Sequence, residues 1–165
     1  MPTGMPMAAG TAVPDFRLTA AVTGREVSPT VLKGKKAVLV LHGVKTQEAP
    51  KDVGKAVRAQ HPGPDVVVAN VVNLKSMGGI WRRVAEAQIN STYERMAAKI
   101  TEKEPGRDPT ELVLILPDWE NTVAPLFGIE DSDAGAAAVV IGSDGNVKGV
   151  ATGKELGEQA LKLLA

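Results

Sequence analysis

The side chains best suited to chemistry follow an apolar run in the first third of the chain. The run Ala37–Leu41 predicts a buried strand, and a helix is expected to begin near Pro50. Between them lie five polar residues: His42, Lys45, Thr46, Gln47 and Glu48. In open α/β sheets such a strand-to-helix turn is a frequent binding site, because the first N–H groups of the helix have no partner within it. The sequence therefore places the candidate site at this turn.

His42 offers the most specific chemistry of these residues. A neutral imidazole could bind a transition metal or a haem iron, or accept a proton as a general base. Met77 could complete a His/Met pair if the 73–79 loop folds over the strand ends. The alternative is a structural role, in which His42 forms a hydrogen bond to the backbone at the end of its strand.

The polar residues after His42 also have two interpretations. Together with the helix N-terminus, Lys45 and Thr46 could hold an anion. Ordinary helix capping explains the same residues, since Thr is a good cap and Glu48 is favourable near the positive end of the helix dipole.

A second group of candidates lies where the 73–79 loop enters the next predicted helix. Arg82, with two further basic residues nearby, could contact a phosphate or carboxylate, or it could pair with Glu86 on a solvated helix face. Trp81 and Trp119 each follow a predicted strand end, so they could line one pocket or pack in the core.

The composition excludes several classes of function. The 165 residues include no cysteine, which rules out disulfides, thiol peroxidase or disulfide-exchange activity, and thiolate metal sites. Lys plus Arg (19) equals Asp plus Glu (19) and only 3% of residues are aromatic, so no nucleic-acid partner is expected. No apolar run approaches the ~20 residues of a membrane span and the N-terminus does not resemble a signal peptide, so we expect a cytoplasmic protein without a membrane partner.

Hydrophobic periodicity predicts an α/β protein with one domain, 13–165, after a flexible N-terminus, 1–12. The predicted strands are 14–19, 26–27, 37–41, 65–72, 112–116, 136–141 and 147–151. The predicted helices are 29–32, 49–60, 80–100, 121–127 and 154–164. The longest helix should bury an apolar stripe from Trp81 to Ile100 and carry Lys99 on its opposite side.

Four stretches in this order resemble the redoxin branch, that is the peroxiredoxin and TlpA type, of thioredoxin-like proteins. Ala12–Leu18 is similar to the A-P-D-F-x-L start of these proteins. Gly24–Ser28 and Leu32–Lys35 are similar to their G-x-x-V-S and L-K-G-K segments. Asp118 with 123–129 is similar to D…V-A-x-x-F-G-V, and Val139–Val147 to the hairpin F-L-I-D-x-D-G-x-V. The stretches span nearly the whole chain.

The resemblance implies an active site at the same turn, but the residues for redox chemistry are missing. Redoxins place a nucleophilic or redox cysteine at the end of the first core strand or the start of the next helix. Aligned on Val38 to Leu41, a C-x-x-C pair would fall near Gln47 and Pro50. The family's cis-proline would fall near Ala136, where a trans bond is expected because a non-proline cis bond costs ~3 kcal/mol. The resemblance therefore implies a redox-inactive protein.

We therefore predict a thioredoxin-like α/β protein of three layers, with a central mixed sheet and an N-terminal hairpin, that binds an unknown small molecule or protein partner without a cofactor. The predicted cleft comprises His42, Lys45, Thr46, Gln47, Glu48, Met77, Trp81, Arg82, Trp119 and Ala136. Two alternatives rest on His42, as a ligand of haem or a transition metal, or as the base of a non-thiol enzyme.

Overall fold

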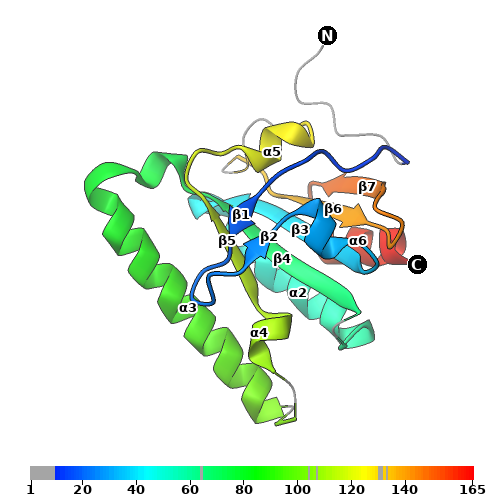
Figure 1. Ribbon diagram of the computed structural model, residues 1–165, viewed down its shortest axis with the longest axis horizontal. Helices are drawn as coiled ribbons and strands as arrows, with labels where there is room; N and C mark the ends of the chain where they lie inside the picture. The colour runs from blue at the N-terminus through cyan, green and yellow to red at the C-terminus, as the bar shows by residue number, and fades with distance from the viewer. Residues whose placement is uncertain (1–9, 64, 104, 107, 130–131, 133) are drawn as a thin grey trace.

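A five-stranded mixed sheet, with the strand order β5-β4-β3-β6-β7, organises the fold, and a separate hairpin, β1-β2, lies beside it (Figure 1). The computed structural model describes residues 10–165 except 64, 104, 107, 130–131 and 133. The strands are β1 (Leu18–Thr19), β2 (Glu26–Val27), β3 (Lys36–Gly43), β4 (Val66–Asn73), β5 (Leu114–Asp118), β6 (Ala137–Ile141) and β7 (Val147–Thr152). The helices are α1 (Pro29–Leu32), α2 (Glu48–Gln60), α3 (Arg82–Lys103), α4 (Pro109–Leu112), α5 (Val123–Leu126) and α6 (Leu156–Leu164). The predicted fold class and hairpin are confirmed.

The sheet is built on β3 and β4, the two strands with long apolar runs. They pair in parallel along their whole length, from Lys36 opposite Val66 to Gly43 opposite Asn73. Successive side chains point to opposite faces of a strand, and both faces of these strands are buried, so a continuous apolar sequence is favoured.

Separate cores form on the two faces of the sheet. On one face α2 and α6 pack through Val53, Val57 and Leu164 onto the sheet. On the other face Phe16 and Phe127 meet edge to face, with ring centroids 6.4 Å apart. In Figure 1 the hairpin β1-β2 lies in front of the sheet, and α2 and α6 lie behind it. These layers give the predicted three-layer arrangement.

The long helix α3 lies along one side of the sheet, next to α4 (Figure 1). Its buried residues, Ala85 and Tyr93, belong to a third apolar cluster with residues of β4 and β5. The helix starts two residues later than predicted, because two 3₁₀ turns, Lys75–Met77 and Gly79–Trp81, precede it. Trp81 is 55% exposed, so its predicted place in the buried stripe is wrong.

The edge strand β5 includes two residues that the sequence pattern places beyond its end. Pro117 and Asp118 both pair with β4. Proline lacks an N–H group, but one side of an edge strand has no partner strand, so proline is tolerated there. Asp108 accepts a hydrogen bond from the Thr110 N–H at 3.0 Å and caps α4, a helical turn that the sequence pattern does not predict.

The first described residues pair with the β6–β7 hairpin. The Gly10 N–H donates to the Val147 carbonyl at 2.7 Å, and the Val147 N–H donates to the Thr11 carbonyl at 2.8 Å. Most of the N-terminus predicted to be flexible, 1–9, lies outside the described residues. Among the described residues, no helix is long and apolar enough to span a membrane.

Candidate functional site

The turn after β3 is closed by the side chain of Thr46. Its hydroxyl accepts a hydrogen bond from the Gly43 N–H at 2.8 Å and donates one to the Ser132 carbonyl at 2.6 Å. The Gln47 amide donates to the Val44 carbonyl at 2.9 Å. These bonds fix the path from β3 into α2, which favours the structural interpretation of Thr46.

His42 lies near the end of β3 with its side chain in the interior. Only 5% of the residue surface is exposed, and Nδ1 lies 3.1 Å from the carbonyl oxygen of Gly43. A proton on Nδ1 makes this contact a hydrogen bond and puts the lone pair of the ring on Nε2. The backbone thus orients the imidazole, and the ring forms part of a cavity wall.

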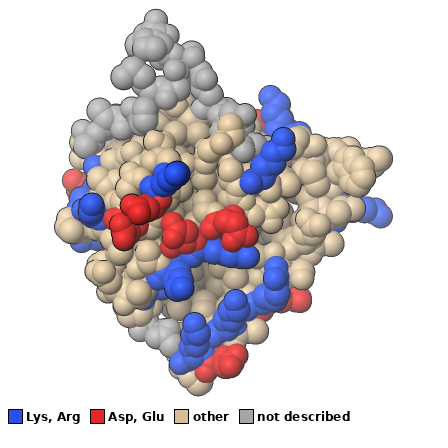
Figure 2. All heavy atoms as spheres, turned by 180° about the vertical axis from the view of Figure 1, so that it is seen from behind, with Lys and Arg blue, Asp and Glu red and all other residues tan. Residues whose placement is uncertain are grey.

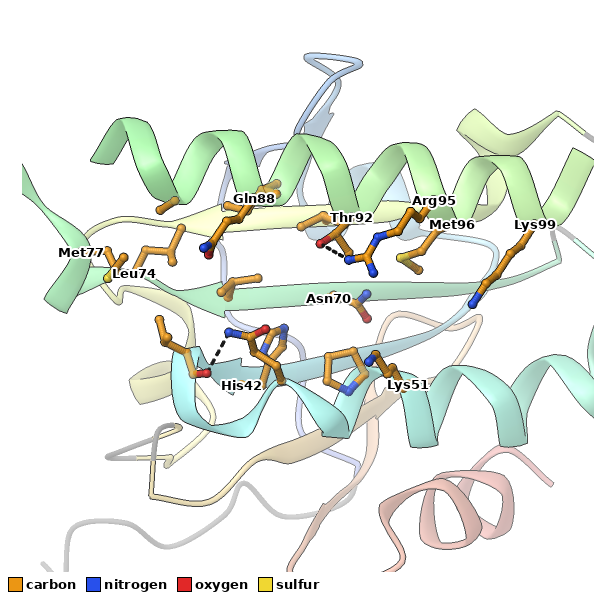
Figure 3. Close-up of a pocket in the computed structure, with 17 residues that line it drawn as sticks. His42, Lys51, Asn70, Leu74, Met77, Gln88, Thr92, Arg95, Met96 and Lys99 are labelled. Carbon is orange, nitrogen blue, oxygen red and sulfur yellow. Dashed lines mark hydrogen bonds between the residues drawn. The ribbon is translucent and has the colours of Figure 1, made fainter. Parts of the chain in front are cut away.

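A cavity of about 290 Å³ lies between α2 and α3, over β3, β4 and β5; we call it the α2–α3 cavity. Figure 3 shows the two helices along its sides and the sheet as its floor. Much of its lining is apolar, contributed by Val44, Val72, Leu74, Met77, Ile89 and Ile115. Its volume is near the lower end of the ~300–1,000 Å³ typical of ligand pockets, so it suits a small molecule.

Asn70 supplies a buried polar group to the floor of the α2–α3 cavity. It lies in β4 between Val40 of β3 and Ile115 of β5, and only 7% of its surface is exposed. Its Oδ1 has no hydrogen-bond partner among the described residues. Such an unpaired buried acceptor costs about 1–3 kcal/mol. Figure 3 shows Asn70 in the space between the two helices. The Oδ1 atom itself is shielded from solvent, so a donor on a ligand could meet it only if the amide turned toward the cavity.

Three basic side chains line the α2–α3 cavity, Lys51 of α2 and Arg95 and Lys99 of α3. Arg95 and Lys99 lie one helical turn apart on the same side of α3, and Figure 3 shows both extending into the space between the helices. Arg95 Nη2 donates to Thr92 Oγ1 at 3.3 Å, and Lys51 Nζ lies 3.6 Å from Glu48 Oε1. No acidic residue is among the described residues that line the cavity.

The structure divides the predicted cleft between two hollows. His42, Gln47 and Met77 line the α2–α3 cavity. Arg82 and Trp119 line a second hollow, formed with β1 and the end of β5, in which the Arg82 guanidinium carbon lies 4.3 Å from the centroid of the Trp119 ring. The α2–α3 cavity thus brings together three of the predicted residues. Arg82 and Trp119, at the start of α3 and after the end of β5, face the second hollow instead.

The other predicted residues line neither hollow. Trp81 is largely exposed, and Lys45 and Glu48 are exposed on the turn. Ala136 is partly buried against the core between the sheet and α2 and α6. No cis peptide bond occurs between described residues, as expected for the bond at Ala136.

Sequence reasoning missed Asn70, Arg95 and Lys99. The available signal for Asn70 is a single amide inside the otherwise apolar run of β4. The sequence pattern places Lys99 on the side of its helix opposite the apolar stripe; Lys99 is indeed exposed, but it also lines the cavity, which the pattern does not predict. The residues of α3 that line the cavity are spaced by threes and fours from Ala85 onward, and Lys99 belongs to that series.

Comparison with known proteins rests on structure alone. No family model matches the sequence, and no curated protein matches it. StoA from Bacillus subtilis is similar with a TM-score of 0.61 and 14% identity, over 94% of this chain and 99% of that chain. The dsbF of MTB, solved in mixed oxidized and reduced forms, has a TM-score of 0.54 and 25% identity over 90% and 94%. The exposed lipoprotein thioredoxin Etrx1 from Streptococcus pneumoniae has a TM-score of 0.58 and 20% identity over 90% and 98%.

These similarities settle the fold and leave location and activity as separate questions. One of the three proteins is described as an exposed lipoprotein, so the cytoplasmic location of the present chain stays a prediction. Identities of this size support conclusions about architecture, and the sequence itself supplies the absence of cysteine. The chain therefore has a thioredoxin-like fold and contains no cysteine.

Proposed function

We propose that this protein is a redox-inactive binding module that holds a small ligand in the α2–α3 cavity, beside the turn where the resemblance to redoxins places their cysteines. Thiol–disulfide exchange needs a thiolate, and this chain has no cysteine to supply one. The observation that carries the proposal is the unpaired Oδ1 of Asn70, a buried acceptor on the floor of a cavity. Apolar walls with a few convergent polar groups are the usual lining of a ligand pocket.

The arrangement of the walls suggests how a ligand would lie. In Figure 3 Met77 and Leu74 flank one end of the α2–α3 cavity, and Arg95 and Lys99 lie toward the other. Asn70 lies on the floor between these ends. A molecule along α3 would thus meet the basic side chains of this helix at one end only.

A thermal-shift screen with a filled-cavity variant tests the proposal. Thr92 lines the α2–α3 cavity, so Thr92→Trp should occupy part of its volume. Thr101→Trp is the matched control, because Thr101 is exposed on the same helix and does not line the cavity. Medium-chain acids, alcohols and amines are the probes. A probe at a hundred times its Kd should stabilise the wild type and Thr101→Trp by ~2.7 kcal/mol, and Thr92→Trp much less.

Two results would count against the small-ligand proposal. One is that no probe raises the Tm of the wild-type protein. The other is that Thr92→Trp keeps the full shift, which would place binding on an outer surface and favour a protein partner.

His42 supports a second candidate, the binding of haem or a transition metal. His42 and Met77 line the same cavity, so these two residues would supply the imidazole and thioether ligands of such a site. The described residues offer no group of three or more His, Cys, Asp or Glu side chains for a metal ion, so such a site would depend on His42. Metal content and visible absorbance of purified protein, compared with His42→Ala, test this candidate; a colourless, metal-free wild type would exclude it.

A non-thiol enzyme with His42 as general base is the third candidate. Any activity found should then depend on pH between about 5 and 8, where histidine commonly titrates. A flat profile across that range, or full activity in His42→Ala, would argue against it.

A further inference from the structure

The basic residues of the α2–α3 cavity are a local departure from a balanced charge distribution. Basic and acidic residues are equal in number, 19 each, and Figure 2 shows both signs interspersed over one face of the molecule. The described cavity lining, in contrast, has three basic residues and no acidic one. Lys51 lies within ion-pair distance of Glu48, at 3.6 Å, so the excess positive charge on the cavity wall comes chiefly from Arg95 and Lys99.

The basic residues of α3 that line the cavity lie toward one of its ends, although apolar residues line both ends. In Figure 3 Leu74 and Met77 lie at one end, with Gln88 and His42 nearer that end, while Arg95, Met96 and Lys99 lie toward the other. From Gln88 to Lys99 α3 extends about 16 Å, at 1.5 Å per residue. This length accommodates a medium-length apolar chain with a polar group at one end.

The third element of recognition is Asn70. Its Oδ1 has no hydrogen-bond partner among the described residues, and an amide oxygen can act only as an acceptor. Figure 3 shows it on the floor between Lys51 and Arg95, toward the basic end of the cavity. A ligand that satisfies it needs a hydroxyl or N–H group close to its anionic group, and the shielded amide must turn toward the cavity to accept that hydrogen bond.

We infer that the ligand of the α2–α3 cavity is a small amphipathic anion, with a carboxylate or phosphate at Arg95 and Lys99, a hydrogen-bond donor at Asn70, and an apolar body that extends toward Met77. This inference rests on the proposed function. It assigns a charge and a donor to the ligand, where the proposed function requires only that a small molecule binds.

Four octyl compounds separate these requirements: octanoate, 3-hydroxyoctanoate, octanol and octylamine. Binding is followed by NMR of protein labelled with ¹³C at the methionine methyl groups, because Met77 and Met96 both line the cavity. Their signals are assigned with Met77→Leu and Met96→Leu. Octanoate should bind on the order of tenfold more tightly than octanol, since it gains charge-assisted hydrogen bonds, and octylamine should bind least. Octyl phosphate, measured beside octanoate, distinguishes a phosphate from a carboxylate ligand.

A double variant with a matched control assigns the charge preference to its residues. Arg95→Gln/Lys99→Gln should remove most of the preference for octanoate over octanol. Arg83→Gln/Lys103→Gln removes the same charge from exposed positions of the same helix that do not line the cavity, and it should keep the preference. All four positions are exposed, and urea unfolding checks that each variant is folded.

A separate comparison tests whether the ligand needs a hydrogen-bond donor at Asn70. In the wild-type protein 3-hydroxyoctanoate should bind several-fold more tightly than octanoate, and Asn70→Leu should abolish that difference. Equal binding of octanoate and octanol, or a double variant that behaves like its control, would overturn the inference and leave the proposed function standing. If none of the octyl compounds perturbs the Met77 or Met96 signals, the inference and the small-ligand proposal both fail.

Discussion

At the residue scale, Asn70 carries a cost to folding, and the proposed function gives this residue a role in binding the ligand. Its neighbours across the sheet are Val40 and Ile115, so an apolar side chain would suit the position. The amide instead leaves one acceptor without a partner. A buried polar group that weakens folding is commonly a functional one, because selection for stability alone would replace it.

Replacing Asn70 by leucine should therefore stabilise the free protein by about 1 kcal/mol, because a buried unpaired acceptor is removed and a side chain of similar size fills its place. The midpoint of urea unfolding measures this change. Asn70→Ala is the comparison, since it removes the amide but enlarges the cavity and should gain less. A loss of stability in Asn70→Leu would show that the amide makes interactions that β4 requires.

The site could be predicted from the sequence only where it depends on strand ends. His42 and Met77 follow or end predicted strands, and parallel strands end at one edge of a sheet, so their proximity to one cavity was foreseeable. The contribution of Arg95 and Lys99 depends on how α3 lies over the sheet. Local periodicity identifies the most apolar face of a helix. The face of α3 that lines the cavity carries both apolar and basic residues, so periodicity does not identify it.

At the scale of elements, α3 is held to the sheet through Tyr93. This side chain is buried in a cluster with Val113 and Ile115, and its hydroxyl has no hydrogen-bond partner among the described residues. Burial raises the pKa of Tyr93 above its ordinary value, the charge of Asp108 raises it further, and Arg25 opposes both effects. Tyr93 is the single tyrosine of the chain, so its ionisation can be observed without interference from another phenol.

The stability of the protein should fall as the pH rises above about 10. The unfolded chain loses the Tyr93 proton near that pH, while the folded protein retains it until its higher pKa is reached, so deprotonation favours unfolding. Between about pH 9 and 11, the range in which tyrosine titrates, the free energy of unfolding of Tyr93→Phe should fall less than that of the wild type. Unfolding of both proteins by urea, with phenolate absorbance as the monitor of ionisation in the wild type, checks the expectation. Parallel curves for the two proteins would contradict it.

The helices and strands can be predicted from the sequence except where their bounds depend on the surrounding structure. The two long parallel strands, β3 and β4, are apolar runs in the sequence. The turn at Gly145, between the apolar segments of β6 and β7, indicates their hairpin. Pro117 belongs to β5 because β5 is an edge strand, and edge position is a property of the complete sheet. Trp81 lies in a 3₁₀ turn before α3, although its spacing matches the apolar stripe of the helix.

At the scale of the whole molecule, a thioredoxin-like fold is formed by a chain that contains no cysteine. The strand order and the turn from β3 into α2 need no cysteine, because Thr46 and the backbone close that turn. A fold does not determine its chemistry, which depends on the residues at a site. The fold should therefore still provide an environment that activates a thiol at the start of α2.

A cysteine at the start of α2 should be more acidic than one at its end. Gln47 precedes the first turn of α2, where the positive end of the helix dipole stabilises a thiolate, and Ala59 is exposed in the last turn, where the dipole opposes it. The carboxylate of Glu48 works against the effect but lies 3.6 Å from Lys51.

We therefore expect the thiol pKa of Gln47→Cys to lie below the ordinary value of about 8.5 and that of Ala59→Cys to lie at or above it. The pH dependence of alkylation by iodoacetamide gives both values. The two variants introduce the same side chain into the same helix, so their difference reports the position. A thiol at position 47 no more acidic than that at position 59 would mean that this turn lacks the electrostatic environment for thiol chemistry as well as a cysteine.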